Sequence, residues 1–425
     1  MMKCILKDLI EYSKDGEWGK DQSFEESEEM LCVRGTDFES ARFGSTEKVP
    51  RRFIAQRHAD RKRLQPWDVL IEAAGGTKDQ PTGRTVLLKP SVFRRASLPL
   101  TCASFSRLIR FRTDLCDPAF MFWYLQSLYH SDIMRAYHTQ HTGVARFQWT
   151  TFAENEPLQI PDLPTQRKIA GILSAYDDLI ENNLRRIKIL EAMAQSLYRE
   201  WFVHFRFPGH ESVKFTDSEL GKIPVGWKPT DLAAVCVKEK GIQTGPFGSQ
   251  LHESDYSDEG VPVVMPKDLI GFRIRTDSIA RIPEETADKL FRHRMKLGDI
   301  VYGRRGDIGR RAFIMPHQVG WFCGTGCLRI RPDPDAVNGW YLFSFLGQDN
   351  VASLIAGRAQ GVTMPNLNTG ILSSVPVTLP PKSIQEHFAN LSFPLAQARE
   401  VLQSQIQTLR RTRDLLLPKL LTNYE

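Results

Sequence analysis

The sequence has no apolar run long enough to cross a membrane and no cysteine pair with the spacing of a metal site. No stretch reaches the roughly 18 consecutive apolar residues that a spanning helix needs. Charge interrupts the apolar residues from Lys3 onward, unlike a secretory signal, so we expect a cytoplasmic protein. The seven cysteines are scattered without a C-x-x-C pair, which favours reduced thiols over disulfides or bound zinc. A membrane protein and a disulfide-stapled secreted scaffold are therefore excluded.

The motifs of nucleotide-binding and methyl-transferring enzymes are also missing. Gly221-Lys222 is followed by Ile223, where a phosphate loop needs a hydroxyl for magnesium. No Asn-Pro-Pro or Asp-Pro-Pro precedes an aromatic residue, so the pocket that would hold an amino group for methylation is absent. His138 and His141 form no recognisable nucleophile and base pair with Cys102. The sequence predicts no catalytic residue and no metal ligand, and it favours structural or DNA-facing histidines.

What the sequence does contain is an ordinary globular composition with unevenly placed charge. Of 425 residues, 41% are apolar and 25% charged, and the length favours two domains. The net charge is +6, but between positions 48 and 63 seven basic residues accompany one acid, Asp60. The basic residues are Lys48, Arg51, Arg52, Arg57, Arg61, Lys62 and Arg63. This run is either a phosphate-facing surface or a solvated, self-repelling loop.

The chain repeats itself at an offset of 217 to 219 residues in its later part. The segments matched at this offset are Trp123-Tyr124-Leu125 with Trp340-Tyr341-Leu342, Gly143-Val144 with Gly361-Val362, and Gln166 with Gln385. Earlier in each copy, Trp67-Asp68-Val69-Leu70 matches Gly298-Asp299-Ile300-Val301 at a larger offset, because loops differ in length. Each match is weak alone, but their common order indicates a tandem duplication.

Each copy has short strand-like runs, then an aromatic helix, then a long helix with heptad spacing. This order predicts a mixed α/β protein: two α/β globular units in tandem repeat, each followed by a long coiled-coil helix. Trp123, Tyr124, Trp340 and Tyr341 stand at helical spacing, so we expect them in the cores.

The two long helices are predicted after Pro164 to about Phe205 and from about Ser383 to Leu421. Apolar residues in them alternate steps of four and three, the period of a coiled coil. The expected seam or partner-binding positions are Ile169, Leu173, Tyr176, Ile180, Asn183, Ile187, Leu197 and Trp201, then Leu395, Leu402, Leu409 and Leu416. Pro394 costs about 3 kcal/mol inside a straight helix, which predicts a bend.

An antiparallel pairing that brings Ile169 near Leu420 places Asn183 beside Gln405. The two amides then bond each other and fix the register. The alternative is that both amides face a partner helix or water.

The residues of the first long helix resemble the specificity subunit of Type I restriction-modification systems. The resemblance rests on Leu163-Pro164-Thr165-Gln166-Arg167-Lys168-Ile169-Ala170-Gly171-Ile172-Leu173-Ser174, on Asp177-Asp178 with Asn183, and on Trp201-Phe202. Residues 223–227, 245–251, 299–301 and 415–421 continue it, so it covers nearly the whole chain. The first copy departs from this pattern in two ways: residues 25–29 are acidic, and the Pro-Phe-Gly-Ser loop of residues 246–249 has no counterpart. These differences predict that the two domains recognise different DNA half-sites.

The resemblance implies a non-catalytic chain that selects the sequence of a bipartite double-stranded DNA target. It also implies that the two α/β units are recognition domains, separated by two long antiparallel coiled-coil helices. The implied parts are a first recognition domain (1–160), a central helix (161–207), a linker (208–222), a second recognition domain (223–382) and a distal helix (383–425). The implied partners are two adenine-N6 methyltransferase subunits, which up to two restriction and translocation subunits join. S-adenosylmethionine, ATP and magnesium are expected on those partners. A coiled-coil scaffold that touches nucleic acid without reading it is the alternative.

The residues themselves point to recognition chemistry in two loops of each copy. Residues 303–311 place four arginines among glycines, which lets a backbone approach a polyanion while guanidiniums bond phosphate or guanine. Residues 142–146 and 361–366 are either base-contacting loops or plain turns before the long helices. The candidate DNA-contacting residues are Arg34, Thr36, Arg51, Arg52, Arg57, Lys78, Arg84, Thr142, Arg146, Lys267, Arg304, Arg305, Arg310, Arg311, Thr363 and Asn366.

Overall fold

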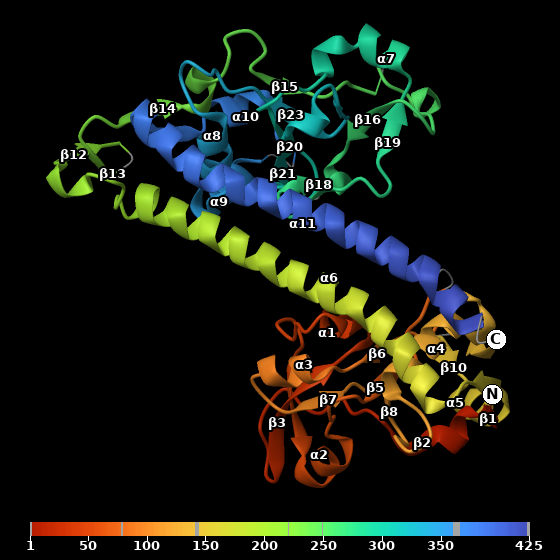
Figure 1. Cartoon of the computed structure of the whole chain (residues 1–425). Helices are drawn as coiled ribbons and strands as arrows, with labels where there is room; N and C mark the ends of the chain where they lie inside the picture. The colour runs from red at the N-terminus through yellow and green to blue at the C-terminus, as the bar shows by residue number, and fades with distance from the viewer. Residues whose placement is uncertain are drawn as a thin grey trace. The chain divides into compact units, whose positions relative to one another are not determined.

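The computed structural model describes residues 2–77, 80–140, 144–219, 221–248, 250–359 and 366–422. The chain divides into two compact units (Figure 1). Unit 1 comprises Met1–Ile189 and Arg399–Glu425, and unit 2 comprises Leu190–Ala398. Among the described helices, none is both long enough and apolar enough to span a membrane.

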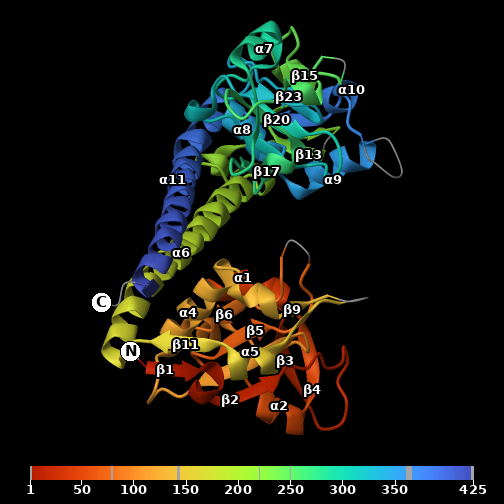
Figure 2. The same cartoon turned by 90° about the vertical axis from the view of Figure 1, so that its right-hand side faces the viewer.

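Unit 1 is built on two sheets. The first has the order β2 (Ile10–Asp15), β8 (Ser106–Phe111), β5 (Val69–Glu72) and β6 (Thr85–Leu87). The second has the order β4 (Arg51–Ala55), β3 (Ser27–Val33) and β7 (Leu100–Cys102), with β3 parallel to β7. Two small ribbons are β1 (Met2–Ile5) with β11 (Pro157–Ile160), visible near the N-terminus in Figure 2, and β9 (His138–Thr139) with β10 (Arg146–Phe147).

The helices of unit 1 cover these sheets. They are α1 (Phe38–Arg42), α2 (Gln56–Lys62), α3 (Pro90–Arg95), α4 (Pro118–His130) and α5 (Trp149–Asn155). The Asp117 side chain caps α4 by accepting a hydrogen bond from Phe120 N at 2.9 Å, and Pro118 occupies the first turn. The aromatic face of α4 packs against the first sheet, which confirms Trp123 as a core residue.

Unit 2 repeats this topology. Its first sheet has the order β15 (Ile242–Thr244), β23 (Cys327–Ile330), β20 (Ile300–Gly303) and β21 (Arg311–Phe313). Its second has the order β19 (Ala280–Ile282), β16 (Val261–Val264) and β22 (Phe322–Cys323), with β16 parallel to β22. The ribbons are β14 (Lys228–Asp231) with β24 (Pro376–Leu379), β12 (Phe215–Ser218) with β13 (Gly221–Pro224), and β17 (Leu269–Ile270) with β18 (Arg273–Ile274). The helices are α7 (Glu284–Lys289), α8 (Gly339–Phe345), α9 (Asp349–Arg358) and α10 (Thr369–Ser373).

Two long helices complete the fold: α6 (Leu163–Tyr198), continued by the π-helical turn η4 (Arg199–Val203), and α11 (Lys382–Thr422). Their observed ends agree with the heptad pattern. Helix α11 is continuous through Pro394, so this proline does not break it. The Ser392 hydroxyl donates a hydrogen bond to Phe388 O at 2.8 Å in the turn that precedes the proline.

Within unit 1 the parts of α6 and α11 pack antiparallel in the predicted register. Ile169 and Leu173 share a core cluster with Leu417 and Leu421. The Asn183 side chain donates to Gln405 Oε1 at 3.3 Å, so the expected amide contact is present.

The burial along α11 corrects one expectation. Leu402 is buried, but Leu395, Leu409 and Leu416 are half-buried and Gln405 is exposed. Ile406, Leu417 and Leu421 are more deeply buried. In unit 1, α11 packs against the domain body as well as against α6. Its side chains that face the domain body are more deeply buried than those at the predicted seam with α6. On α6, Ile169, Leu173, Ile180, Asn183 and Trp201 are buried, while Tyr176, Ile187 and Leu197 are half-buried.

Candidate nucleic-acid interface

In unit 1 five loops meet where β2, β3, β5 and β7 end. They are residues 16–19, 34–37, 73–77, 103–105 and 144–146, and we call them the loop edge of unit 1. Backbone hydrogen bonds join them: Glu17 N to Cys102 O (2.8 Å), Ala103 N to Val33 O (2.9 Å), Ala73 N to Phe105 O (2.8 Å) and Gly75 N to Ala145 O (3.0 Å). The edge is therefore a connected surface and not a set of separate turns.

Unit 2 has the same edge, formed by residues 245–248, 265–268, 304–310 and 324–326 together with Asn366. The backbone hydrogen bonds that join it are Gly245 N to Cys327 O (3.0 Å), Gly324 N to Val264 O (3.0 Å), Arg304 N to Gly326 O (2.9 Å) and Leu367 N to Arg304 O (2.8 Å). The two loops that the sequence singled out in each copy are therefore neighbours. Lys78, Thr142 and Thr363 lie outside the described residues.

The loop edge of unit 2 presents cationic and amide side chains. Arg305 and Lys267 are exposed. Arg304 donates from Nε to Asn366 Oδ1 at 3.3 Å, and burial, together with the neighbouring Arg305 charge, lowers the pKa of its guanidinium. Arg310 is paired with Asp307 at 2.8 Å. This edge combines exposed positive charge with one arginine held in place by an amide.

At the loop edge of unit 1, Thr36 and Arg146 are exposed. Arg34 is held by Asp37 (2.8 Å). Arg84 lies behind loop 34–37 and forms a two-point ion pair with the buried Glu72 at 2.6 and 2.9 Å. Its guanidinium therefore supports the edge instead of projecting from it.

Two candidate arginines are buried, which corrects their placement on a DNA-facing surface. Arg52 is 7% exposed; it donates to Trp18 O and Asp21 and stacks on the Trp18 ring at 4.3 Å. Arg311 is 5% exposed and lies over Phe272 and Phe343 at 4.4 and 5.1 Å. Burial lowers the pKa of Arg311 to about 10, with Tyr302 opposing that shift.

The basic run of residues 48–63 is also not one phosphate-facing surface. Lys62 pairs with Glu17 at 3.0 Å, Arg63 with Glu28 at 2.6 Å, and Arg51 with Glu29 at 3.6 Å. Arg57 is exposed on α2, next to Ala55, whose strand partner Ser27 begins β3 at the end opposite loop 34–37. Acidic side chains therefore pair with part of this run, two of them, Glu28 and Glu29, from β3.

The comparisons with known proteins agree with a duplicated recognition fold. A family model described as the Type I restriction modification DNA specificity domain matches residues 56–192 and 250–409. The chain belongs to this family. Each unit holds most of one matched region, so the protein has two tandem DNA-recognition domains of a family whose role is specificity and not catalysis. The scaffold alternative is the weaker one.

Relatives within the family carry the same description. The chain is 28% identical over 306 residues to the Type I restriction enzyme MjaIX specificity subunit of Methanocaldococcus jannaschii, covering 70% of this chain and 67% of the relative. The MjaVIII specificity subunit of that organism is 24% identical over 298 residues, covering 67% and 65%. The S subunit from M. genitalium has the same fold, with a TM-score of 0.61, 16% identity, and coverage of 100% of this chain and 96% of that one.

One pair of equivalent loops in the two units was not recognised from the sequence. The loop 16–19, Gly-Glu-Trp-Gly, occupies in unit 1 the place that Gly-Pro-Phe-Gly occupies in unit 2. In both, a Cβ on the first glycine would overlap a carbonyl oxygen, of Ala103 for Gly16 and of Gly324 for Gly245. The first domain therefore has this loop with different residues. The shared Gly-x-aromatic-Gly spacing was the available signal.

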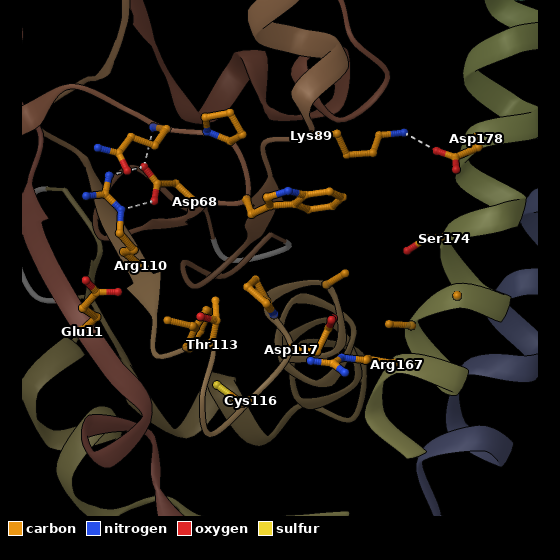
Figure 3. Close-up of a pocket in the computed structure, with 18 residues that line it drawn as sticks. Glu11, Asp68, Lys89, Arg110, Thr113, Cys116, Asp117, Arg167, Ser174 and Asp178 are labelled. Atoms are coloured by element: carbon orange, nitrogen blue, oxygen red, sulfur yellow. Dashed lines mark hydrogen bonds and ion pairs between the residues drawn. The ribbon is translucent and has the colours of Figure 1, made fainter. Parts of the chain in front are cut away.

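A cavity of about 540 Å³ lies in unit 1 between the domain body and α6 (Figure 3). Two ion pairs line it, Asp68 with Arg110 at 2.8 Å and Lys89 with Asp178 of α6 at 2.8 Å, together with Glu11, Asp117 and Arg167. Burial raises the pKa of the Asp68 carboxyl, although Arg110 opposes the shift. Asp299 and Arg331 form the equivalent pair in unit 2 at 2.6 Å. We interpret these pairs as structural.

The cysteines do not provide a nucleophile. None is in a disulfide, and burial raises the pKa of Cys32, Cys116, Cys236 and Cys323 to about 12. These four thiols are protonated at neutral pH. Within the described ranges no three His, Cys, Asp or Glu side chains are grouped to hold a metal.

Proposed function

We propose that each unit reads one half of a bipartite, asymmetric double-stranded DNA target through its loop edge. The observation that carries this proposal is the duplicated edge: four loops in the same arrangement in both units, with exposed Thr36 and Arg146 in one unit and exposed Lys267 and Arg305 in the other. Guanidinium and ammonium groups contact phosphates, while arginine and amide side chains recognise base edges in the major groove. The side chains differ between the edges, so the two half-sites differ.

Binding of the full chain, assembled with its methyltransferase subunits, to a randomised duplex library tests this function. We expect selection of two fixed base clusters separated by a fixed gap. Exchange of residues 8–150 for those of another family member should change one cluster and leave the other and the gap unaltered. A library with no enriched cluster would support the scaffold alternative and refute sequence reading.

The exposed cations of unit 2 give a second test. The double variant Lys267→Ala with Arg305→Ala should weaken binding and reduce the slope of log K against log salt by about 0.9 for each lost phosphate contact. Lys228→Ala is the matched control, because Lys228 is exposed on β14, outside the loop edge. An unchanged slope in the double variant would remove these residues from the interface.

We propose further that the long helices dock two adenine-N6 methyltransferase subunits, which up to two restriction and translocation subunits join. In unit 1 the helices leave Leu179 (51%), Val401 (58%) and Leu415 (59%) exposed, which is unfavourable unless another protein covers them. S-adenosylmethionine, ATP and magnesium are assigned to those subunits. Leu179→Glu should abolish co-purification of the methyltransferase, whereas Phe215→Glu, at an equally exposed site on β12, should not.

A further inference from the structure

Among the described residues of each loop edge, the most exposed aromatic side chain comes from a different loop in the two units. Phe105 is 53% exposed in the turn between β7 and β8 of unit 1. Phe247 is 60% exposed in the loop that follows β15 of unit 2. Exposure of a phenylalanine ring to water is unfavourable, so the presence of these two rings at the surface indicates a functional role.

The loop of Phe247 is anchored on both sides of the ring. Gly245 and Pro246 are buried, and Gly245 packs so tightly on the Gly324 carbonyl that no larger residue fits. On the other side Leu251 is 5% exposed within a core cluster, and Leu251 N donates to Phe247 O at 3.3 Å. The fixed flanks hold the ring outward, on the same edge as Arg305.

The turn of Phe105 is anchored through its backbone. Its carbonyl accepts hydrogen bonds from Ala73 N at 2.8 Å and Ala74 N at 3.2 Å. The flanking Ala103 and Ser106 are buried. The ring therefore projects from the centre of the unit 1 edge, between loop 73–77 and loop 16–19.

The two equivalent positions differ between the units in how they present an aromatic ring. In unit 1 the residue that corresponds to Phe247 is Trp18, whose face is covered by the buried Arg52 guanidinium at 4.3 Å. In unit 2 the residue that corresponds to Phe105 is Gly326, which has no side chain and a φ of +89°. Trp18 is 38% exposed with Arg52 over its ring, so Phe105 and Phe247 are the more exposed rings of the described edge residues, at different places among the cations.

We propose that Phe105 and Phe247 contact bases directly, one in each half-site. Cations on the same edge neutralise phosphates, which leaves the ring to make the apolar contact with base edges that polar side chains cannot make. The two rings occupy different loops, so they contact different positions in the two half-sites. This inference rests on the proposed function and assigns two base-contacting residues to it.

The test compares Phe105→Ala and Phe247→Ala with wild type in the randomised duplex selection, using the full chain with its methyltransferase subunits. Each variant should lose base preference at one or two positions of a single half-site, and the two variants should affect opposite halves. Affinity for the wild-type target should fall about 10-fold, with the salt slope unchanged, because the lost contact is uncharged. Tyrosine at either position keeps the ring and should keep the preference.

Phe215→Ala is the control, because Phe215 is 52% exposed on β12, outside the loop edge, and should leave selection unchanged. If wild type selects no bipartite sequence, the proposed function itself fails. If wild type selects one and the alanine variants retain the same base preferences and affinity, the function stands and the role of the rings is refuted. A change in both half-sites from one variant would also refute it.

Discussion

The two units share one sheet topology but attach to the long helices through different chemistry. In unit 1, Arg42 and Arg413 both bind Asp177 of α6 at 2.6 Å, and the side chains of all three are largely buried. In unit 2, Phe388 of α11 packs among Tyr198, Trp201 and Phe202, with ring centroids 5.0 to 6.2 Å away. Unit 1 thus adds a buried ionic contact to its apolar packing on the helices, whereas unit 2 has an aromatic cluster there.

What both units retain is a backbone hydrogen bond to a glutamine of the helix. Gln166 accepts from Asp117 N at 2.9 Å and donates to Pro161 O at 2.8 Å. Gln385 accepts from Asn338 N at 2.8 Å and donates to Pro380 O at 2.7 Å. After duplication the geometry of attachment remained, while the surrounding side chains diverged. Backbone groups must be satisfied in every copy, whereas a packed surface has many solutions.

The largest effect is expected at Asp177. Asp177→Ala removes the carboxylate that two buried guanidiniums share and leaves Arg413 with the exposed Asp414, which should cost about 3–5 kcal/mol of unit 1 stability. Asp177→Asn keeps the shape but not the charge and should recover little. Hydrogen exchange of unit 1 peptides in urea measures the loss. Asp178→Ala is the control, because Asp178 is 65% exposed and its pair with Lys89 should contribute below about 1 kcal/mol. Equal effects of the two alanine variants would contradict an ionic attachment.

A smaller effect is expected at His293 of unit 2. The side chain is 4% exposed, and burial, assisted by the Arg292 and Arg329 charges, lowers its pKa from 6.5 to about 4. The unfolded chain therefore binds the proton first as the pH falls, so stability is full above pH 6.5 and declines toward pH 4. The expected loss is on the order of 2 kcal/mol. Urea unfolding of unit 2 between pH 7 and 4 measures it, and His293→Gln should flatten the profile; an unchanged profile would contradict the assignment.

The aromatic attachment should tolerate a conservative change that the ionic one does not. Phe388→Leu keeps an apolar side chain at a site that is 1% exposed, so we expect about 1–1.5 kcal/mol of lost unit 2 stability. Raising salt should leave that loss unaltered, because no charge is involved. A loss of stability as large as that caused by Asp177→Asn would contradict the chemical distinction between the two units.

The architecture could be predicted because it depends on periodicity and repetition. Apolar residues spaced alternately four and three positions apart predicted both long helices. The sequence matches, which occur in the same order in both copies, predicted the duplication. The buried stripe of α11 was misplaced because a helix that packs against both a partner helix and a domain has two apolar faces. One heptad pattern describes only one of them.

The candidate interface was predictable only in part, because a basic residue does not state which side of a strand it occupies. Arg51 and Arg52 are adjacent on β4, so they point to opposite faces, and only Arg51 is exposed. Arg310 and Arg311 divide in the same way at the start of β21. Counting charged residues identifies a basic segment. Because side chains alternate between the two faces of a strand, about half of the cations in such a segment face inward. Phe105 and Phe247 were not identified as interface candidates from the sequence, because an isolated aromatic residue in a turn resembles a core residue.

The smallest expected effect lies on the helix seam, where the predicted register brought two amides together. Asn183 is 6% exposed and donates to Gln405, whose side chain reaches solvent. Replacing each by leucine, singly and together, should give a coupling of about 0.5–1 kcal/mol in the unfolding of unit 1, because each single change leaves an amide without its partner. The matched cycle pairs Asn183→Leu with Thr408→Leu, since the Thr408 hydroxyl bonds only Ser404 O within α11 among the contacts observed, and it should be additive. Additivity in the Asn183 and Gln405 cycle would show that the two amides contribute to stability independently and that hydrophobic packing alone sets the register of the pair of helices in unit 1.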